Sequence, residues 1–154
     1  MKNNVLIVGA GKIGTIRATV IKKLSPKSKL YIFDTNFKKA TLLAKEVNGI
    51  VVRSLTHGLK DKNIDAVIVA VVNQYSKIIC LLALKNKKHV LCEKPMGVNY
   101  KEAKQIELAV KKYKKRELSD LMDYYFKSRK IDQFAPSIAV MMSRDTRDAW
   151  KSKR

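Results

Sequence analysis

The chain has 154 residues, about the length of one ordinary domain, and its 46% hydrophobic content with only 3 Pro and 6 Gly excludes a disordered or collagen-like protein. Its longest apolar stretch, residues 66–72, is far shorter than a membrane span of roughly 20 residues, and the N-terminus lacks a secretory-signal pattern, so we expect a cytoplasmic protein with no membrane partner. Lys and Arg number 33 against 13 Asp and Glu, and the formal net charge of +20 attracts anionic ligands.

Strand and helix patterns alternate from the N-terminus to about residue 115. Apolar segments predict strands at 5–8, 30–33, 50–52, 65–72 and 89–92, and the near-continuous runs at 5–8 and 65–72 are typical of strands buried on both faces of a parallel sheet. Apolar residues at helical spacing predict helices at 13–24, 38–47 and 76–84, and a further helix that begins at the cap residue Asn99. In the first helix we expect one apolar stripe against the core, made of Ile13, Ile16, Val20, Ile21 and Leu24.

This alternation indicates βαβ units joined by right-handed crossovers. We therefore predict an α/β protein with a doubly wound parallel sheet, the Rossmann fold, over residues 1–116. Residues 117–154 lose the pattern and form an atypical C-terminal tail, for which we predict a helix at 117–130, a short strand at 137–142 and a charged end.

A glycine motif lies between the first predicted strand and the first predicted helix. It reads Gly9-Ala10-Gly11-Lys12-Ile13-Gly14, which is G-x-G-x-x-G in the strand–turn–helix context that a dinucleotide-binding turn requires. Gly9 permits the tight turn, Gly11 lets the backbone approach a pyrophosphate, and Gly14 allows the helix to pack closely. The backbone N–H groups and the positive end of the helix dipole then face the phosphates. The alternative is a glycine turn without a ligand.

An acidic residue follows the second predicted strand at the spacing of a ribose-binding carboxylate. Asp34 lies 20 residues after Gly14 (34 − 14), where its side chain can accept hydrogen bonds from the adenosine ribose hydroxyls. A carboxylate there repels a 2′-phosphate and favours NAD over NADP, although Lys38 and Lys39 nearby weaken that preference. The alternative is that Asp34 is a turn or cap residue.

Two more segments end at the carboxyl edge of the predicted sheet, where ligands of open α/β sheets bind. Val71 and Asn73 follow the fourth strand and are candidate cofactor contacts, with helix capping as the alternative for Asn73. Glu93 and Lys94 follow the fifth strand. A lysine beside a cofactor can orient a substrate oxygen or take part in acid–base chemistry. The alternative without a function is a surface ion pair between Glu93 and Lys94.

Residues 83–95 form a motif that is highly specific to one protein family. They read Ala-Leu-Lys-Asn-Lys-Lys-His-Val-Leu-Cys-Glu-Lys-Pro. Together with the glycine turn and Asp34 they resemble the N-terminal domain of the glucose–fructose oxidoreductase, inositol dehydrogenase and MocA family, over roughly residues 1–115. The resemblance implies NAD- or NADP-dependent hydride transfer at a sugar or polyol carbon. It also implies that Lys94 is a catalytic residue near the nicotinamide and substrate, and that the Lys94-Pro95 bond is often cis.

The chain departs from that family in two places. The family has Thr-Pro-Asn followed by a histidine, whereas Val71-Val72-Asn73 is followed here by Gln-Tyr and then Ser76 in the place of that histidine. The family also continues into a large substrate domain that supplies an aspartate and a histidine, and residues 117–154 match none of it. Truncation, or a shifted reading frame after Arg116, is the hypothesis that this loss of pattern favours.

Three functions follow as hypotheses. The first is an NAD(H)-binding domain derived from an oxidoreductase that acts on a sugar, polyol or related small molecule. The second is a non-catalytic dinucleotide-binding module that pairs with another copy or subunit through apolar residues such as those at 124–126. The third, nucleic-acid binding, is the weakest, because the positive charge is mostly lysine, scattered and without interleaved aromatic residues.

No metal site is predicted, because the two histidines, His57 and His89, and the two cysteines lack the spacing of metal ligands. We expect Cys80 and Cys92 to be buried free thiols.

Overall fold

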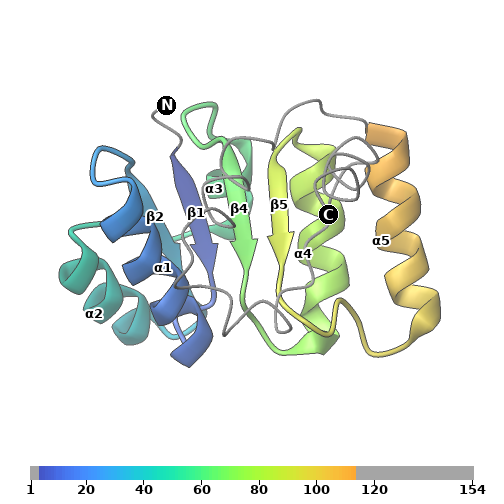
Figure 1. Ribbon diagram of the computed structural model, residues 1–154, viewed down its shortest axis with the longest axis horizontal. Helices are drawn as coiled ribbons and strands as arrows, with labels where there is room; N and C mark the ends of the chain where they lie inside the picture. Colours follow the sequence, from blue (N-terminus) through green and yellow to red (C-terminus); the bar gives the residue numbers. More distant parts are fainter. Residues whose placement is uncertain (1–3, 114–154) are drawn as a thin grey trace, which may run out of the picture.

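The computed structural model describes residues 4–113, which form an alternating series of strands and helices (Figure 1). The predicted tail at 117–154, with its helix, its strand and its apolar residues 124–126, lies outside the described residues. The elements in chain order are β1 (Val5–Val8), α1 (Lys12–Leu24), β2 (Leu30–Phe33), α2 (Phe37–Val47), β3 (Ile50–Val51), α3 (Leu55–Lys60), β4 (Ala66–Val69), α4 (Asn73–Lys85), β5 (His89–Cys92) and α5 (Tyr100–Tyr113).

The five strands make one all-parallel sheet in the order β3-β2-β1-β4-β5. This confirms the predicted doubly wound α/β architecture, because the order runs outward in both directions from the pair β1 and β4. Within that central pair Val5 is opposite Ala66 and Val8 is opposite Val69, so the two strands end level with each other. The carboxyl ends of β1 and β4 therefore form the point at which the strand order reverses.

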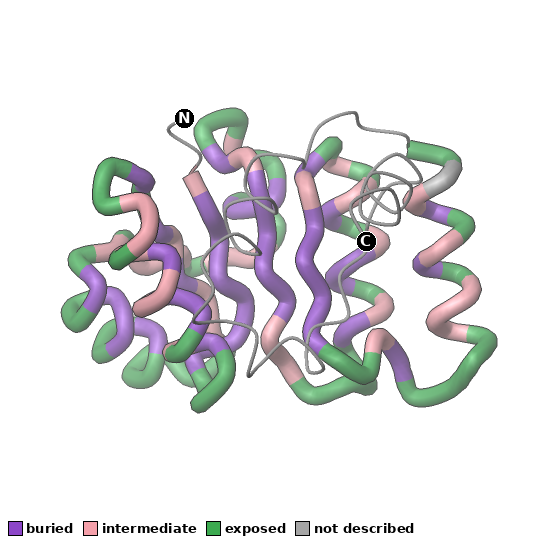
Figure 2. The backbone as a smooth tube through the Cα atoms, in the orientation of Figure 1, coloured by how far each residue is buried: buried purple, intermediate pink, exposed green. Residues whose placement is uncertain are grey.

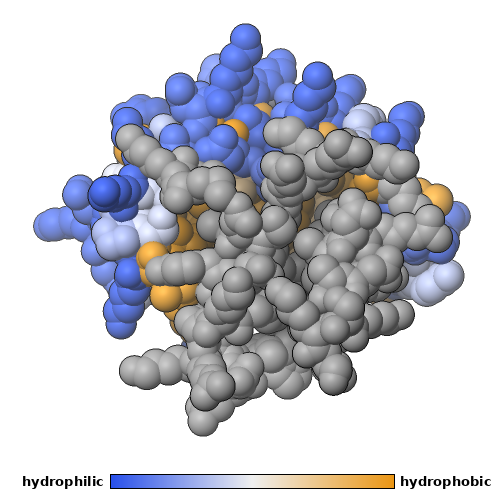
Figure 3. Space-filling model, turned by 45° about the horizontal axis from the view of Figure 1, so that its top comes forward, coloured by the Kyte–Doolittle hydropathy of each residue, from blue (hydrophilic) through white to orange (hydrophobic). Residues whose placement is uncertain are grey.

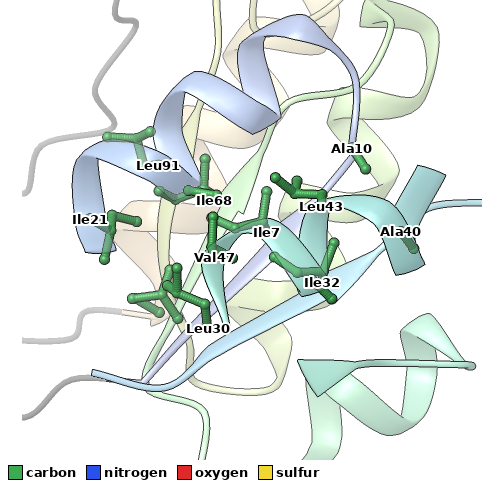
Figure 4. Close-up of a cluster of buried hydrophobic side chains, with 14 residues drawn as sticks. Ile7, Ala10, Ile21, Leu30, Ile32, Ala40, Leu43, Val47, Ile68 and Leu91 are labelled. Carbon is green, nitrogen blue, oxygen red and sulfur yellow. The ribbon is translucent and has the colours of Figure 1, made fainter. Parts of the chain in front are cut away.

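The helices cover both faces of the sheet and create two hydrophobic cores. Side chains of α1 and α2 pack on one face, in the core that includes Ile7, Ile32 and Ile68 (Figure 4). Side chains of α3, α4 and α5 pack on the other face, in the core that includes Leu6 and Val67. Figure 2 shows β1, β4 and β5 buried along most of their length, as their apolar runs predict, whereas β2 alternates between buried and half-buried residues and the edge strand β3 is not buried.

Capping residues mark the ends of several helices. Asn48 adopts a left-handed conformation (φ 49°) that ends α2, and the N–H of the next residue, Gly49, donates to the Ala44 carbonyl at 2.7 Å. The Glu102 N–H donates to Asn99 Oδ1 at 3.0 Å, so Asn99 caps α5 as predicted. The short helix α3 was not predicted, because a six-residue segment that contains Gly58 shows little helical periodicity.

The strand predicted at 65–72 is shorter, and the helix after it begins earlier. β4 ends at Val69, and α4 starts at Asn73 rather than at Ser76. The apolar residues at 70–72 thus belong to the connection at the sheet edge. A continuous apolar sequence does not distinguish the end of a buried strand from a buried connection.

The apolar stripe predicted for the first helix is partly wrong. Ile13 and Ile16 are 43% and 38% exposed, and the buried residues of α1 are Gly14, Arg17, Ala18 and Ile21. The small residues on this side let α1 approach the sheet closely, which turns Ile13 and Ile16 outward. A charged residue, Arg17, consequently lies on the buried side of the helix.

The lysine-rich surface includes the loops at the amino ends of the strands. Lys27, Lys29, Lys62 and Lys87 are all exposed on these loops. Figure 3 turns this edge toward the viewer and shows hydrophilic residues over it. The glycine motif lies at the opposite edge of the sheet.

Among residues 4–113, no helix combines the length and apolar character needed to cross a membrane.

Candidate functional site

The glycine turn at the end of β1 is held in place by its two neighbouring strands. The Gly9 N–H donates to the carbonyl of Phe33, at the end of β2, at 2.8 Å. Gly9 has φ +102°, and a Cβ there would lie 2.3 Å from the carbonyl oxygen of Ala70, just beyond β4. A Cβ on Gly14 would lie 1.8 Å from the Gly9 carbonyl oxygen. The fold itself therefore requires glycine at positions 9 and 14.

Gly11 differs from the other two glycines of the motif. A Cβ at this position would meet no atom of residues 4–113 within 4 Å, and the backbone φ of −81° is accessible to any residue. The packing and the backbone of the described residues therefore do not require glycine at position 11. Open space directly above the first turn of α1 is what the approach of a phosphate group needs.

Two helix N-termini at the point where the strand order reverses have no side-chain cap. Gly11 precedes α1 and Val72 precedes α4, and neither makes a side-chain capping hydrogen bond. By contrast, Asn36 and Ser54 cap α2 and α3. The first N–H groups of a helix have no partners within the helix, so an uncapped N-terminus favours an anion. The α1 terminus thus offers backbone donors beside the open space at Gly11.

Asp34 directly follows β2, as the sequence predicts, and its carboxylate contacts the glycine turn. Its Oδ2 accepts a hydrogen bond from the Ala10 N–H at 2.7 Å, and its Oδ1 accepts one from the Asn36 N–H at 2.7 Å. The carboxylate therefore has the turn role that the sequence analysis left as the alternative. Because each carboxylate oxygen can accept a second hydrogen bond, this role is compatible with binding ribose hydroxyls. The N–H of Ala10 is thereby committed to the carboxylate.

The residues after β4 lie beside the glycine turn. Val71 is half-buried, and its Cγ1 would lie 3.2 Å from a Cβ on Gly9. Asn73 is exposed at the first position of α4, but the cap residue is Val72, so the predicted alternative of Asn73 as a helix cap is wrong. Both predicted residues are therefore at the carboxyl edge, on the β4 side of Gly9.

Ser76, in the place of the family's histidine, faces the protein interior. It is 2% exposed and hydrogen-bonds to Cys92, on β5. The pKa of Cys92 is lowered by the hydrogen bond from the Cys80 thiol and, to a smaller extent, by the one from Ser76. The pKa of Cys80 is raised, first by its hydrogen bond to Cys92 and then by burial. The two thiols are buried and free, as predicted. Ser76 therefore contributes to the packing of α4 on β5 and not to the exposed surface at the carboxyl edge of the sheet.

Glu93 and Lys94 follow β5 and have opposite environments. Glu93 is 9% exposed, whereas Lys94 is exposed. The Glu93 side chain pairs with Arg17 of α1, at 2.5 Å from Nε to Oε1. The alternative of a surface ion pair between Glu93 and Lys94 is therefore wrong. The Lys94-Pro95 peptide bond is cis, as the resemblance implies.

Arg17 was not among the residues predicted to lie at this edge. It lies three positions after Gly14 and one before Ala18, so it belongs to the same side of α1 as these two small residues. That spacing was the available signal, because the small residues mark the side of the helix that approaches the sheet. The stripe of large apolar residues indicated the wrong side.

No group of three or more His, Cys, Asp or Glu side chains within residues 4–113 is arranged to hold a metal ion.

Comparison with known proteins identifies the family. Residues 3–120 match the family model described as "Oxidoreductase family, NAD-binding Rossmann fold", which carries the names glucose–fructose oxidoreductase, inositol dehydrogenase and MocA. The chain belongs to this family. The family resemblance inferred from the motif at 83–95, the glycine turn and Asp34 is confirmed.

Individual relatives match this domain and extend well beyond it. A 2,7-anhydro-N-acetylneuraminate hydratase of Escherichia coli (strain K12) is 31% identical over 105 residues, which make up 68% of this chain and 28% of the relative. A glucose-6-phosphate 3-dehydrogenase of Bacillus subtilis (strain 168) is 35% identical over 100 residues, 63% of this chain and 27% of the relative. The chain spans about a quarter of the length of these curated relatives.

A solved structure shows the same arrangement. GenD2 from gentamicin A biosynthesis, in complex with NAD, superposes with a TM-score of 0.68 at 26% identity. The match covers 73% of this chain and 32% of that chain.

Proposed function

We propose that residues 1–116 form a domain that binds NAD(H) across the carboxyl edge of the sheet. The pyrophosphate lies over Gly11 and receives hydrogen bonds from backbone N–H groups at the start of α1, in the segment Lys12-Ile13-Gly14. The adenosine ribose binds to Asp34. The open position at Gly11 carries this proposal, since the packing within residues 4–113 gives no reason for glycine there.

The remaining predicted residues take the nicotinamide half of the cofactor. Val71 and Asn73 line its path past the end of β4, and Glu93 and Lys94 border it at the end of β5. Lys94 is the catalytic residue of the proposal: its exposed ammonium donates a hydrogen bond to a substrate oxygen and orients it beside the nicotinamide. When bound, the nicotinamide supplies or accepts the hydride.

For the reaction, we propose hydride transfer on a sugar, a polyol or a related small molecule. Both curated relatives are named for carbohydrate substrates. NAD is the favoured dinucleotide, because the Asp34 carboxylate would repel the 2′-phosphate of NADP. The exposed Lys38 and Lys39 at the start of α2 reduce that discrimination, so we expect weaker but measurable binding of NADP.

A titration with NADH and NADPH, followed by calorimetry, tests the proposal. We expect NADH to bind more tightly than NADPH and saturating NADH to raise the melting temperature of the full chain. No binding of either dinucleotide at millimolar concentration would refute it.

Turnover is measured separately, with a panel of sugars and polyols. Binding without turnover would favour the second hypothesis, a dinucleotide-binding module that works with another copy or a partner subunit. A steeply salt-dependent affinity for nucleic acid, with no effect of NADH on stability, would instead support the third.

A further inference from the structure

The Arg17–Glu93 pair connects two elements that are far apart in the sequence. Arg17 is in the second turn of α1 and Glu93 directly follows β5, yet the guanidinium and the carboxylate are in contact and both side chains are largely buried. The Glu93 backbone is also fixed, because its N–H donates to the Val69 carbonyl at 3.0 Å. Burying two charges is costly unless each has its partner, so the arrangement holds only while both residues are present.

The acidic side chain at the end of β5 points to the α1 side of the sheet, where Arg17 pairs with it. Consecutive residues of a strand alternate between its faces, and here Leu91 belongs to the core on the α1 side and Cys92 to the core on the α4 side. Glu93 continues this alternation and meets Arg17 on the α1 side. Lys94 is its next neighbour in the chain and is exposed. Without Arg17, Lys94 is the base nearest in sequence to which the carboxylate could turn.

We propose that Arg17 is a positioning residue that keeps Glu93 away from Lys94. Among the salt bridges within residues 4–113, Glu93 is paired with Arg17 and not with Lys94. The Lys94 ammonium then stays available to an oxygen atom of a bound ligand instead of being neutralised by the adjacent carboxylate. The benefit to catalysis rests on the function proposed for Lys94, whereas the placement of Glu93 does not depend on that function.

The test is the rate at which an amine-directed acylating reagent modifies Lys94, measured by mass spectrometry in the full chain without cofactor. Lys39, exposed on α2, serves as the internal reference. In Arg17→Met we expect the Lys94 rate, relative to Lys39, to fall roughly threefold, the size of effect expected for an exposed ion pair. Arg17→Lys should restore most of the rate, because it returns the positive charge.

Two further variants complete the test. In Glu93→Gln the Lys94 rate should stay at the wild-type value, because the carboxylate that is removed was not in contact with Lys94. In the double variant Arg17→Met/Glu93→Gln the rate should also return to the wild-type value. The double variant removes both buried charges and is expected to fold even if Arg17→Met alone does not.

Two outcomes overturn the proposal. One is an unchanged Lys94 rate in folded Arg17→Met, which would leave the pair with a purely structural role. The other is a faster Lys94 rate in Glu93→Gln or in the double variant, which would mean that Glu93 already interacts with Lys94. Failure of the wild-type chain to bind NADH would remove the proposed function, but it would not alter the interpretation of either labelling result.

Discussion

Replacing Gly11 and Gly14 separately by alanine distinguishes a dinucleotide site from a glycine turn without a ligand. Both substitutions add one methyl group to the same motif. At Gly11 the added Cβ would meet nothing within 4 Å and the backbone φ is −81°, so we expect the free energy of unfolding to change by less than about 0.5 kcal/mol. At Gly14 the added Cβ would lie 1.8 Å from the Gly9 carbonyl oxygen, so α1 must move. We expect a loss of about 3 kcal/mol or more.

The effect on binding should have the opposite order. The methyl group of Gly11→Ala occupies the space through which the pyrophosphate approaches the N–H groups of α1, so NADH affinity should fall at least tenfold, equivalent to about 1.4 kcal/mol. Unfolding in urea, followed by circular dichroism, gives the stability of each variant. Calorimetry gives the NADH dissociation constant of any variant that remains folded.

Two results would refute this reasoning. Wild-type NADH affinity in Gly11→Ala would mean that no phosphate lies over that position. Wild-type stability in Gly14→Ala would mean that α1 does not rest on the Gly9 carbonyl, and the geometry of the turn would be wrong.

Three further predictions concern other contacts. Asp34→Ala should lower the free energy of unfolding by about 1–2 kcal/mol, because the N–H groups of Ala10 and Asn36 lose their acceptor, and calorimetry should show NADPH gaining affinity relative to NADH. Lys88→Met should cost about 2–3 kcal/mol in urea unfolding, because the buried ammonium donates to two backbone carbonyls. The hydrogen bond from Lys77, and then that from a backbone N–H, lower the pKa of Glu102. The carboxylate of Glu102 should therefore stabilise the fold at pH values above the usual pKa of a glutamate, and this contribution should be lost as the pH falls through the lowered pKa. Glu102→Gln should flatten that part of the curve of unfolding free energy against pH.

The sequence was sufficient to predict the architecture because the signals for it are local. A strand buried on both faces is a continuous apolar run, and its length separates it from the helices that follow. Parallel pairing then follows from the alternation of strands with helices. The exceptions are short or ambiguous segments, such as the six residues of α3 and the apolar connection after β4, where periodicity carries little information.

The candidate site was predictable in its backbone part and not in its buried charges. Gly9, Gly14 and Asp34 have the positions that the motif implies, because a turn between a strand and a helix allows few conformations. The Arg17–Glu93 pair joins residues 76 positions apart, and no local pattern connects them. Predicting that pair requires knowing which side of α1 meets the sheet, and the small residues Gly14 and Ala18, rather than the large ones, decide it.

The way the two halves of the proposed site are held predicts that dinucleotide binding and the chemistry proposed for Lys94 respond to different substitutions. The phosphate and ribose half consists of backbone at the ends of β1, β2 and β4, tied together by the hydrogen bonds of Gly9 and Ala10 and by the close contact of Gly9 with Ala70. These ties lie entirely within residues 4–113, so this half is formed before any ligand arrives. The reactive group of the proposed function, Lys94, is instead an exposed side chain. In the further proposal its availability depends on the Arg17–Glu93 pair, which holds its acidic neighbour. Substitutions at Arg17 should therefore change the chemistry of Lys94 while leaving NADH affinity close to that of the wild type, and substitution of Gly11 should do the reverse.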